Sequence, residues 1–434
     1  MTAAGRLEIA AQWLVLGVLI LLPVGRISEL PVLIACIGAF LLVALLRGHA
    51  WNGTAARSVL LLFASYWLPI LFSAFDAVNP HKTWMVALET LRFLPFALFV
   101  AWALRDADAW QRCQLAIAAV VGLWLLDAWV QMATGYSLAG AAEQERLAGI
   151  FGADNLKLGP ALAALSPFFL HVARERAGRW GLLLAFLLML APILLAGSRA
   201  AWLTFALVTC VFAWRETRSL RRFLPLLLGV VLGIVFSIGM LWKESDGFQA
   251  RIERSLLVFN GNAQAIDQAS AWRLSIWAAA IDMIRAHPLN GVGARGFRND
   301  YAEHARGGDP FVDAKSGEGA AHAHQIVLEV LSETGIIGLL CWIFGSATAI
   351  RMFRRATPAQ RQRAFVPALA LVVTCNPLNT HLAFYSAWWG LFFWWLLALY
   401  CAAFSRVAQQ ADGDAGDHQG RADQHQPQQL ASPR

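Results

Sequence analysis

The sequence predicts an all-α polytopic membrane protein with about twelve transmembrane helices, and three observations support this class. Hydrophobic residues make up 58% of the 434 positions and charged residues only 15%, whereas soluble domains are about 45–50% apolar and about 25% charged. The apolar residues gather in runs long enough to cross a bilayer as a helix, which takes about 20 residues. The arginines gather in alternate connections between these runs. This composition excludes a disordered chain and argues against a multidomain cytosolic enzyme.

The candidate spans follow one another along most of the chain. They cover residues 8–25, 30–46, 59–75, 84–104, 113–131, 158–173, 181–198, 200–214, 223–242, 326–350, 364–380 and 384–404. The long apolar run 181–214 is interrupted by Gly197-Ser198-Arg199. We expect a hairpin of two helices with this tripeptide at its tip, because an arginine buried within a span is costly.

The basic residues sort the connections into two sets. The arginine-rich set holds Arg47, Arg57, Arg105, Arg112, Arg174, Arg176, Arg179, Arg215, Arg218, Arg221, Arg222, Arg351, Arg354, Arg355, Arg361 and Arg363. The connections between them are poorer in arginine and lysine. By the positive-inside rule the arginine-rich set is cytoplasmic, so we expect both termini inside and a multi-pass protein surrounded by membrane lipids. The net charge of +7 therefore reports topology, and no nucleic-acid partner is expected.

The chain is expected to form one integral membrane domain over residues 1–404. Residues 405–434 are rich in Gln, Asp and Gly and predict a disordered cytoplasmic tail. The first span lacks an A-x-A cleavage site after its apolar core and predicts a retained helix. The six cysteines lie within or at the ends of spans, so neither a disulfide framework nor a zinc site is indicated.

Two connections on the opposite face are long, about 132–157 and 243–323. Within the second, 270–287 predicts an amphipathic helix with Trp277, Ile281 and Ile284 on one stripe, stopped by Pro-Leu-Asn-Gly. We expect such helices to lie on the membrane face and to roof a site. The segment 291–296 fits G-x-G-x-x-G. Because a helix and a turn precede it instead of a strand, its glycines predict a tight turn and not a dinucleotide site.

The segment that follows the long connection carries a candidate base. His324 precedes an apolar helical pattern, so it would lie near a helix N-terminus at the membrane surface, where the dipole keeps the ring neutral and suited to a general base. The alternatives are an interfacial histidine with a structural hydrogen bond, or a metal pair of His322 and His324. The H-x-H spacing lacks a nearby third ligand.

Two arginines on the same face are candidate ligands for a diphosphate. Arg199 lies at the hairpin tip and Arg273 on the predicted amphipathic helix, and a planar guanidinium suits diphosphate oxygens. The alternative for each is snorkelling to lipid headgroups. Glu89 and Arg92, three residues apart inside a span, predict a structural ion pair, and Asp127 is ambiguous.

Four segments resemble motifs of the O-antigen ligase/polymerase superfamily of bacterial glycan transferases. Gly197-Ser198-Arg199-Ala200 resembles its S-R-[GA] turn. Arg146-Leu147-Ala148-Gly149-Ile150-Phe151, with Asn155 and Gly159 beyond, is similar to its R-L-x-G-x-F loop. Arg273 through Trp277 to His287-Pro288-Leu289-Asn290-Gly291-Val292-Gly293 resembles its R…W…hPl-G-x-G block. His324-Gln325, followed after nine residues by Gly335-x-x-Gly338, matches H-[NSQ]-x9-G-x-x-G, a pattern associated with O-antigen ligases.

The resemblance implies transfer of a polysaccharide from an undecaprenyl-diphosphate-linked O-antigen donor to lipid A-core, on the periplasmic face of a bacterial inner membrane. It implies a GT-C-like fold and inverting, metal-independent chemistry without a cofactor. In these roles His324 would deprotonate the acceptor hydroxyl, and Arg199 and Arg273 would neutralise the diphosphate. Arg146, His322 and Asn155 are candidate substrate-binding residues, and no metal ligand is expected.

Other functions remain open from the sequence. Within the superfamily, an O-antigen or exopolysaccharide polymerase and a protein O-oligosaccharyltransferase differ from a ligase mainly in the acceptor. The lack of a sizeable extra C-terminal domain in this sequence argues modestly against the protein-glycosylating type. A transporter would favour charges along a path and matching halves with broken helices, whereas the polar residues here concentrate on one face.

Overall fold

The computed structural model describes residues 3–46, 54–141, 146–152, 155–244, 246–260, 263–313 and 315–405. Apart from Ser405, the expected tail 405–434 lies outside the described residues. The first half of the bundle comprises α1 (Ala3–Leu21), α2 (Glu29–Leu46), α3 (Thr54–Ser73), α4 (Pro80–Thr90), α5 (Phe93–Ala103), α6 (Ala107–Thr134), a hairpin of β1 (Tyr136–Ser137) and β2 (Gly140–Ala141), and α7 (Leu158–Leu195). The second half comprises α8 (Arg199–Thr217), α9 (Leu220–Glu244), α10 (Asp246–Leu256), α11 (Ala263–Ser270), α12 (Arg273–Ala286), α13 (Phe297–His304), α14 (Ile326–Arg355), α15 (Pro358–Thr374) and α16 (Ala387–Ala402).

The described chain is mostly helical and has the character of a polytopic membrane protein. Six of its helical segments are long and apolar enough to cross a membrane: Arg6–Leu42, Ala55–Ser73, Pro80–Ala103, Ala107–Thr134, Leu158–Leu195 and Ile326–Arg355. Three of these segments contain a non-helical glycine: Gly25 in the first, Gly178 in the fifth and Gly335 in the sixth. Each predicted span overlaps a helix, but the predicted span 84–104 is divided between α4 and α5, and the predicted span 364–380 extends past the end of α15 at Thr374.

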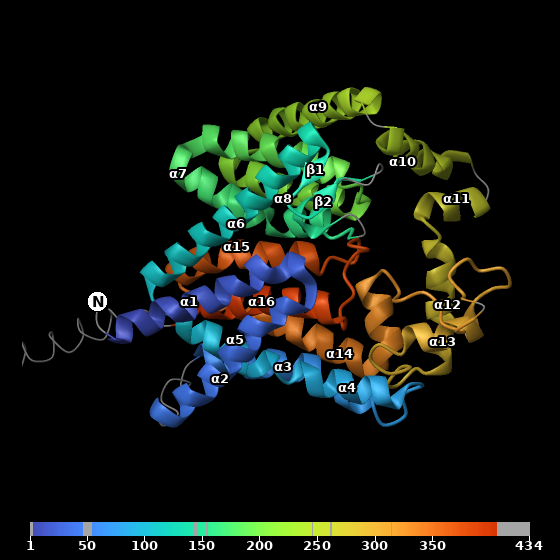
Figure 1. Ribbon diagram of the computed structural model, residues 1–434, viewed down its shortest axis with the longest axis horizontal. Helices are drawn as coiled ribbons and strands as arrows, with labels where there is room; N and C mark the ends of the chain where they lie inside the picture. The colour runs from blue at the N-terminus through green and yellow to red at the C-terminus, as the bar shows by residue number, and fades with distance from the viewer. Residues whose placement is uncertain are drawn as a thin grey trace, which may run out of the picture.

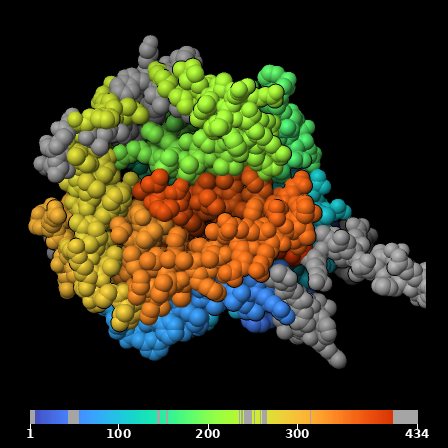
Figure 2. All heavy atoms as spheres, turned by 180° about the vertical axis from the view of Figure 1, so that it is seen from behind, coloured from blue at the N-terminus to red at the C-terminus, as the bar shows by residue number. Residues whose placement is uncertain are grey.

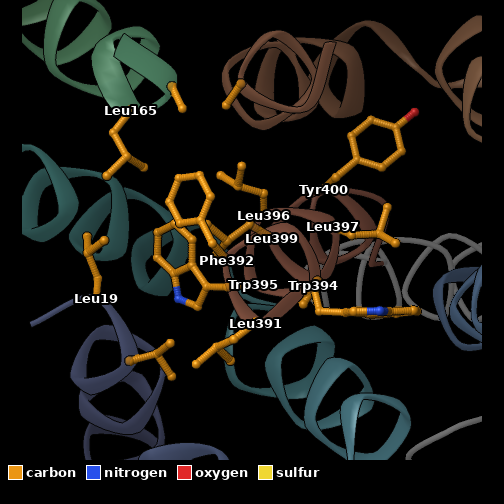
Figure 3. Packing of buried hydrophobic residues seen from close by; sticks show 14 of the residues in the cluster. Leu19, Leu165, Leu391, Phe392, Trp394, Trp395, Leu396, Leu397, Leu399 and Tyr400 are labelled. Atoms are coloured by element: carbon orange, nitrogen blue, oxygen red, sulfur yellow. The ribbon is translucent and has the colours of Figure 1, made fainter. Parts of the chain in front are cut away.

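Helix α16 forms the centre of the bundle. Every residue from Trp389 to Ala402 except Phe393 is buried, as expected for a helix that is apolar on all sides. Figure 3 shows the side chains of α16 packed against Leu19 of α1 and Leu165 of α7. The indole N–H of Trp395 donates to the Val15 carbonyl at 2.9 Å, so even the polar atom of this buried ring has a partner.

The predicted hairpin of the 181–214 run is present. α7 ends at Leu195, and Ser198 caps α8 by accepting a hydrogen bond from the Ala201 N–H at 3.1 Å. Gly197 adopts a φ of 72°, a left-handed conformation that glycine adopts without strain. The turn places Arg199 at the first position of α8, at the tip, as the sequence predicts.

The long connection folds into helices, and the face that α12 buries against the protein is not the predicted stripe. α12 occupies the expected position and ends at His287. Its buried face is Ile276, Ala279, Ala280 and Met283, whereas Ile281 is 40% exposed. The reason is that α12 packs through small side chains on a local apolar core, completed by Val292, Phe297, Tyr301, Ala320 and Ala323.

Helices α10 to α13 gather at one end of the bundle, opposite the end where the N-terminus lies (Figure 1). The arginine-rich connections contact one another at that opposite end. The Arg363 guanidinium donates to the Leu104 carbonyl at 2.9 Å, and Arg215 lies 3.7 Å above the Phe365 ring. The arginine-rich connections that these contacts join therefore lie at the end of the molecule opposite α10 to α13.

One predicted ion pair is wrong. Arg92 lies in the turn between α4 and α5 and pairs with Glu29 of α2 at 3.3 Å, while its second amino group donates to the backbone carbonyl of Glu89. The chain turns at Leu91 and Arg92 instead of continuing as one helix, so the Glu89 carboxylate is not the partner that regular helical spacing suggested.

Helix α14 is broken at Gly335, and the segment 288–293 fills the break. Gly335 has φ 63° and ψ −162°. On one side of it, the Val292 and Gly293 N–H groups donate to the Ser332 and Glu333 carbonyls at 2.8 and 3.0 Å; on the other, Ile336 N–H donates to the Pro288 carbonyl at 3.0 Å. The loop backbone thus satisfies the polar groups that the break releases, which is required inside a membrane protein.

Candidate active site

His324 lies at the end of the bundle that carries α12, immediately before α14. Gln325 caps α14 by accepting a hydrogen bond from the Leu328 N–H at 2.7 Å. His324 itself has a φ of 55°, an uncommon conformation for a residue with a side chain. Its Nδ1 lies 2.8 Å from the Thr380 carbonyl oxygen. A carbonyl only accepts hydrogen bonds, so Nδ1 carries the proton and Nε2 of the neutral ring keeps a lone pair.

The surroundings of His324 favour the neutral ring. Burial lowers its pKa below the usual 6.5, the Thr380 carbonyl opposes this, and the charge of Arg273 lowers the pKa further. Desolvation disfavours the charged form of any histidine. The sequence argument attributed neutrality to the helix dipole, whereas burial is the largest cause.

Two further histidines surround His324. The rings of His322 and His324 lie 3.9 Å apart between centroids, and Nε2 of His322 is buried without a hydrogen-bond partner among the described residues. Burial and then the nearby His324 and Arg295 hold the pKa of His322 well below 6.5. His381, which lies one residue after Thr380 and which the sequence argument missed, has its pKa lowered to about 3, first by burial and then by Arg273.

Arg273 is held at the first position of α12 by a buried carboxylate. Asp267 of α11 accepts hydrogen bonds from the Leu274 N–H at 3.0 Å and from the Ser275 hydroxyl at 2.5 Å. The Ser270 hydroxyl accepts one from the Arg273 N–H at 3.0 Å. Trp272 takes the left-handed conformation, with φ 61°. This cap fixes the start of the helix and thereby the origin of the Arg273 side chain.

Arg199 and Arg273 come together from different elements. Burial, followed by the charge of Arg199, lowers the pKa of Arg273 to about 10. The Arg199 guanidinium donates to the Ala269 carbonyl, which ties the hairpin tip to α11. Two cations held close together, where burial weakens their hydration, favour an anionic ligand between them.

The 146–151 segment also reaches the histidines. Gln131 of α6 accepts hydrogen bonds from the Ala148 and Gly149 N–H groups at 3.2 and 2.7 Å, and the Leu147 N–H donates to the carbonyl of Leu195 at 3.3 Å. These bonds anchor Arg146 near enough to His381 for its charge to contribute to lowering the pKa of that ring.

Asn155 and Asp127, which sequence analysis also singled out, make local hydrogen bonds to the backbone. The Asn155 N–H donates to the Gly152 carbonyl at 3.0 Å, and no hydrogen bond among the described residues joins Asn155 to His324 or Arg273. Asp127, ambiguous in sequence, accepts from the Leu138 N–H at 2.7 Å and so holds the β1–β2 turn. Among the described residues there is also no group of three or more His, Cys, Asp or Glu side chains that could hold a metal ion.

Three ionisable residues beside this site were missed. Arg295 has a φ of 65°; its N–H donates to the Glu333 carboxylate at 2.7 Å, and its guanidinium reaches the Ala321 carbonyl at 3.4 Å. Glu329 and Glu333, one turn apart on α14, are both fully buried. The sequence alone could have indicated these two glutamates, because carboxylates within an apolar span mark a functional or structural site in a membrane protein.

The fold and the site together define a polytopic membrane protein whose ionisable groups converge at one end of its helical bundle. The space-filling view shows the rear face hollowed between the green helices α8 and α9 and the orange-to-red segments α14 and α15 (Figure 2). The end of the bundle that carries α12 brings together five ionisable residues whose charges influence one another: His324, His322, His381, Arg273 and Arg199.

Residues 184–343 match the family model described as O-antigen ligase. The matched region covers less than half of the chain, and over this region the chain is similar to the O-antigen ligase family. The matched region contains Arg199, Arg273 and His324, whereas Arg146 and His381 lie outside it. None of the curated proteins compared with the chain matches it.

Proposed function

We propose that this protein is an O-antigen ligase that transfers a polysaccharide from undecaprenyl diphosphate to a sugar hydroxyl of lipid A-core. The observation that carries the proposal is the arrangement of His324, whose Nε2 keeps a lone pair, beside the half-buried arginines Arg273 and Arg199. A base and a paired cationic clamp are the two groups that transfer from a glycosyl diphosphate needs.

In the proposed reaction, the acceptor hydroxyl oxygen forms a bond to the anomeric carbon while the bond from that carbon to the diphosphate oxygen breaks. The hydroxyl proton goes to Nε2 of His324. The bonding electron pair leaves with undecaprenyl diphosphate, and Arg199 and Arg273 neutralise the charge that develops on it. Attack from the face opposite the leaving group inverts the anomeric carbon. Arg146, His322 and Asn155 would contact the substrates, with Asn155 acting from the turn that follows the 146–151 segment.

The proposal includes a membrane arrangement. All of the predicted spans would cross the bilayer in a GT-C-like bundle, with both termini in the cytoplasm and α10 to α13 in the periplasm of a bacterial inner membrane. The separation of the arginine-rich connections from α10 to α13 supports this orientation. Both substrates carry lipid anchors, so a site beneath helices at the membrane surface suits them.

The deciding experiment is transfer by purified protein in detergent or liposomes, with undecaprenyl-diphosphate-linked polysaccharide as donor and lipid A-core as acceptor. We expect product in the presence of EDTA, because arginines supply the positive charge in this mechanism. Complete inhibition by EDTA, restored by a divalent cation, would contradict the metal-independent mechanism. Absence of transfer under all conditions would contradict the ligase assignment.

A gene deletion separates the ligase from a polymerase of the same superfamily. Loss of a ligase should leave bare lipid A-core and polymer retained on the lipid carrier. Loss of a polymerase should instead leave lipid A-core with single repeat units. Glycan analysis of extracted lipopolysaccharide distinguishes the two outcomes, and unchanged lipopolysaccharide with an unglycosylated protein would point to a protein O-oligosaccharyltransferase.

A further inference from the structure

A polar cavity lies beside the candidate active site, and none of the residues assigned above to catalysis or substrate binding lines it. It has a volume of about 140 Å³ and opens between α4, α5, the start of α16 and Arg295. Its ionisable and hydroxyl-bearing lining residues are Lys82, Arg92, Arg295, Glu89, Thr90, Tyr66, Tyr385 and Ser386. The lining itself holds three cations and one carboxylate, and one of the cations, Arg92, is also paired with Glu29 outside the lining.

Two of these cations are fixed by the fold. The Arg92 side chain is only 12% exposed and pairs with Glu29 at 3.3 Å, yet its Nε atom is buried without a hydrogen-bond partner among the described residues. The backbone N–H of Arg295 donates a hydrogen bond to the Glu333 carboxylate, and the Glu329 carboxylate attracts the Arg295 side chain electrostatically. Fixed guanidinium groups lose little conformational entropy on binding an anion.

The third cation gives the cavity an accessible edge. Lys82 lies in the first turn of α4 with an exposed side chain, and its backbone N–H donates to the Asn79 side chain at 3.1 Å. The ammonium group makes no ion pair among the described residues. It is therefore the lining cation whose removal disturbs the fold least.

Arg295 lies between the cavity and the histidines of the candidate active site. It lines the cavity, its guanidinium donates to the Ala321 carbonyl, and its charge acts on the adjacent His322. The His322 ring in turn lies 3.9 Å from the ring of His324. The two arginines assigned to the donor diphosphate, Arg199 and Arg273, come from α8 and α12, which contribute nothing to the lining of this cavity.

We propose that this cavity binds an anionic group, a phosphate or a carboxylate, carried by the sugar acceptor near the hydroxyl that His324 deprotonates. The inference rests on the proposed ligase function and adds the chemical class of the acceptor. The position of the cavity favours the acceptor over the donor, because the donor diphosphate has its own arginine pair on different helices. Charge-assisted hydrogen bonds from Lys82, Arg92 and Arg295 would hold the group and present the hydroxyl to Nε2.

The test compares Lys82→Ala with wild type in the transfer assay, with intact lipid A-core and with the same acceptor after removal of its phosphates or reduction of its carboxylates. With intact acceptor we expect the acceptor KM to rise about fivefold to tenfold, with donor KM and kcat unchanged, because one charge-assisted contact is lost. With the modified acceptor that lacks the bound group, the wild type should lose the same affinity and Lys82→Ala should cause no further change. The modification that abolishes the difference identifies phosphate or carboxylate.

A matched control is Arg285→Ala, which removes an exposed cation of α12 outside the cavity and should leave both KM values unchanged. An equal effect of Lys82→Ala on modified and intact acceptors, an unchanged acceptor KM, or a rise in donor KM would each overturn the inference while the wild type still transfers glycan. Failure of the wild type to transfer would instead refute the proposed function. Lys82→Arg, which keeps the charge, should restore the wild-type acceptor KM.

Discussion

His324 and Thr380 are 56 residues apart in the sequence, yet Nδ1 of the histidine lies 2.8 Å from the threonine carbonyl oxygen. The bond joins the loop before α14 to the loop before α16. It fixes both the direction of the ring and its tautomer, so that Nε2 is the atom available to accept a proton. A backbone carbonyl serves here as the orienting partner that many catalytic histidines obtain from a carboxylate.

Replacement of His324 by alanine should lower kcat for glycan transfer by at least about 100-fold, because general bases contribute about 10²–10⁴ in rate. The matched control is His81→Ala, an exposed histidine of α4, which should retain wild-type activity. Transfer rates of the two variants, measured at equal amounts of folded protein, provide the comparison. Strong activity of His324→Ala would refute the assignment of the base.

The pH dependence of transfer should reflect the lowered pKa of His324. The base acts when neutral, and burial places the pKa below 6.5, so kcat should stay constant from pH 8 down to about 6.5 and fall only at lower pH. In Arg273→Gln the neighbouring cation is absent, so the pKa should rise and the residual activity should fall at higher pH than in wild type. An acid limb above pH 6.5 in the wild type would contradict the neutral, buried ring.

Substitution of Arg273 by lysine should not preserve function. Lysine keeps the charge but loses the planar fork that binds two phosphate oxygens at once. We expect kcat/KM for the lipid-linked donor to fall about 10-fold to 100-fold, while binding of the acceptor is unaffected. The measurement is steady-state kinetics with each substrate varied in turn. Wild-type kinetics in Arg273→Lys would show that the guanidinium geometry is not used.

The break in α14 predicts a stability effect. Alanine at Gly335 would force a side chain into a left-handed conformation and against the carbonyl of Leu289, a strain of at least about 1–3 kcal/mol. The apparent Tm in detergent should therefore fall by several degrees. Gly229→Ala in α9, where a methyl group meets open space, is the matched control and should leave the Tm unchanged or raise it. An unchanged Tm for Gly335→Ala would mean that the break is not needed.

Local patterns in the sequence predicted much of the fold. Apolar run length located the helices, and Gly197-Ser198 located the tip that presents Arg199, because span length and cap chemistry depend on neighbouring residues. The position of His324 just before α14 also followed from local pattern. These features need no knowledge of which helix packs against which.

The features that were missed depend on contacts between distant segments. The partner of Arg92 is Glu29 on another helix, and the buried face of α12 is decided by the local core that it joins. His381 becomes part of the site only because the loop before α16 folds against His324. No periodicity within one segment contains this information.

The roles of Arg199, Arg273 and His324 came from a family resemblance, and the structure adds that these residues approach one another. Arg295, Glu329 and Glu333 were visible as charges in or near an apolar helix, but their mutual contacts required the fold. The sequence therefore indicated which residues could act, whereas tertiary packing decided which of them can act together.

The pairing of residues 292 and 293 with residues 332 and 333 has a practical consequence for labelling this protein. The segment between these residues, 294–331, begins and ends at the same point on α14. Hydrogen bonds hold both of its ends, so their positions do not depend on the length of the segment. At its outer part, Gly307 and Gly308 are exposed and have no neighbour within the reach of an added Cβ. Because lengthening a closed loop costs little, a short epitope or fluorophore-binding tag inserted there would report on the end of the molecule that carries α10 to α13, while α14 keeps its register.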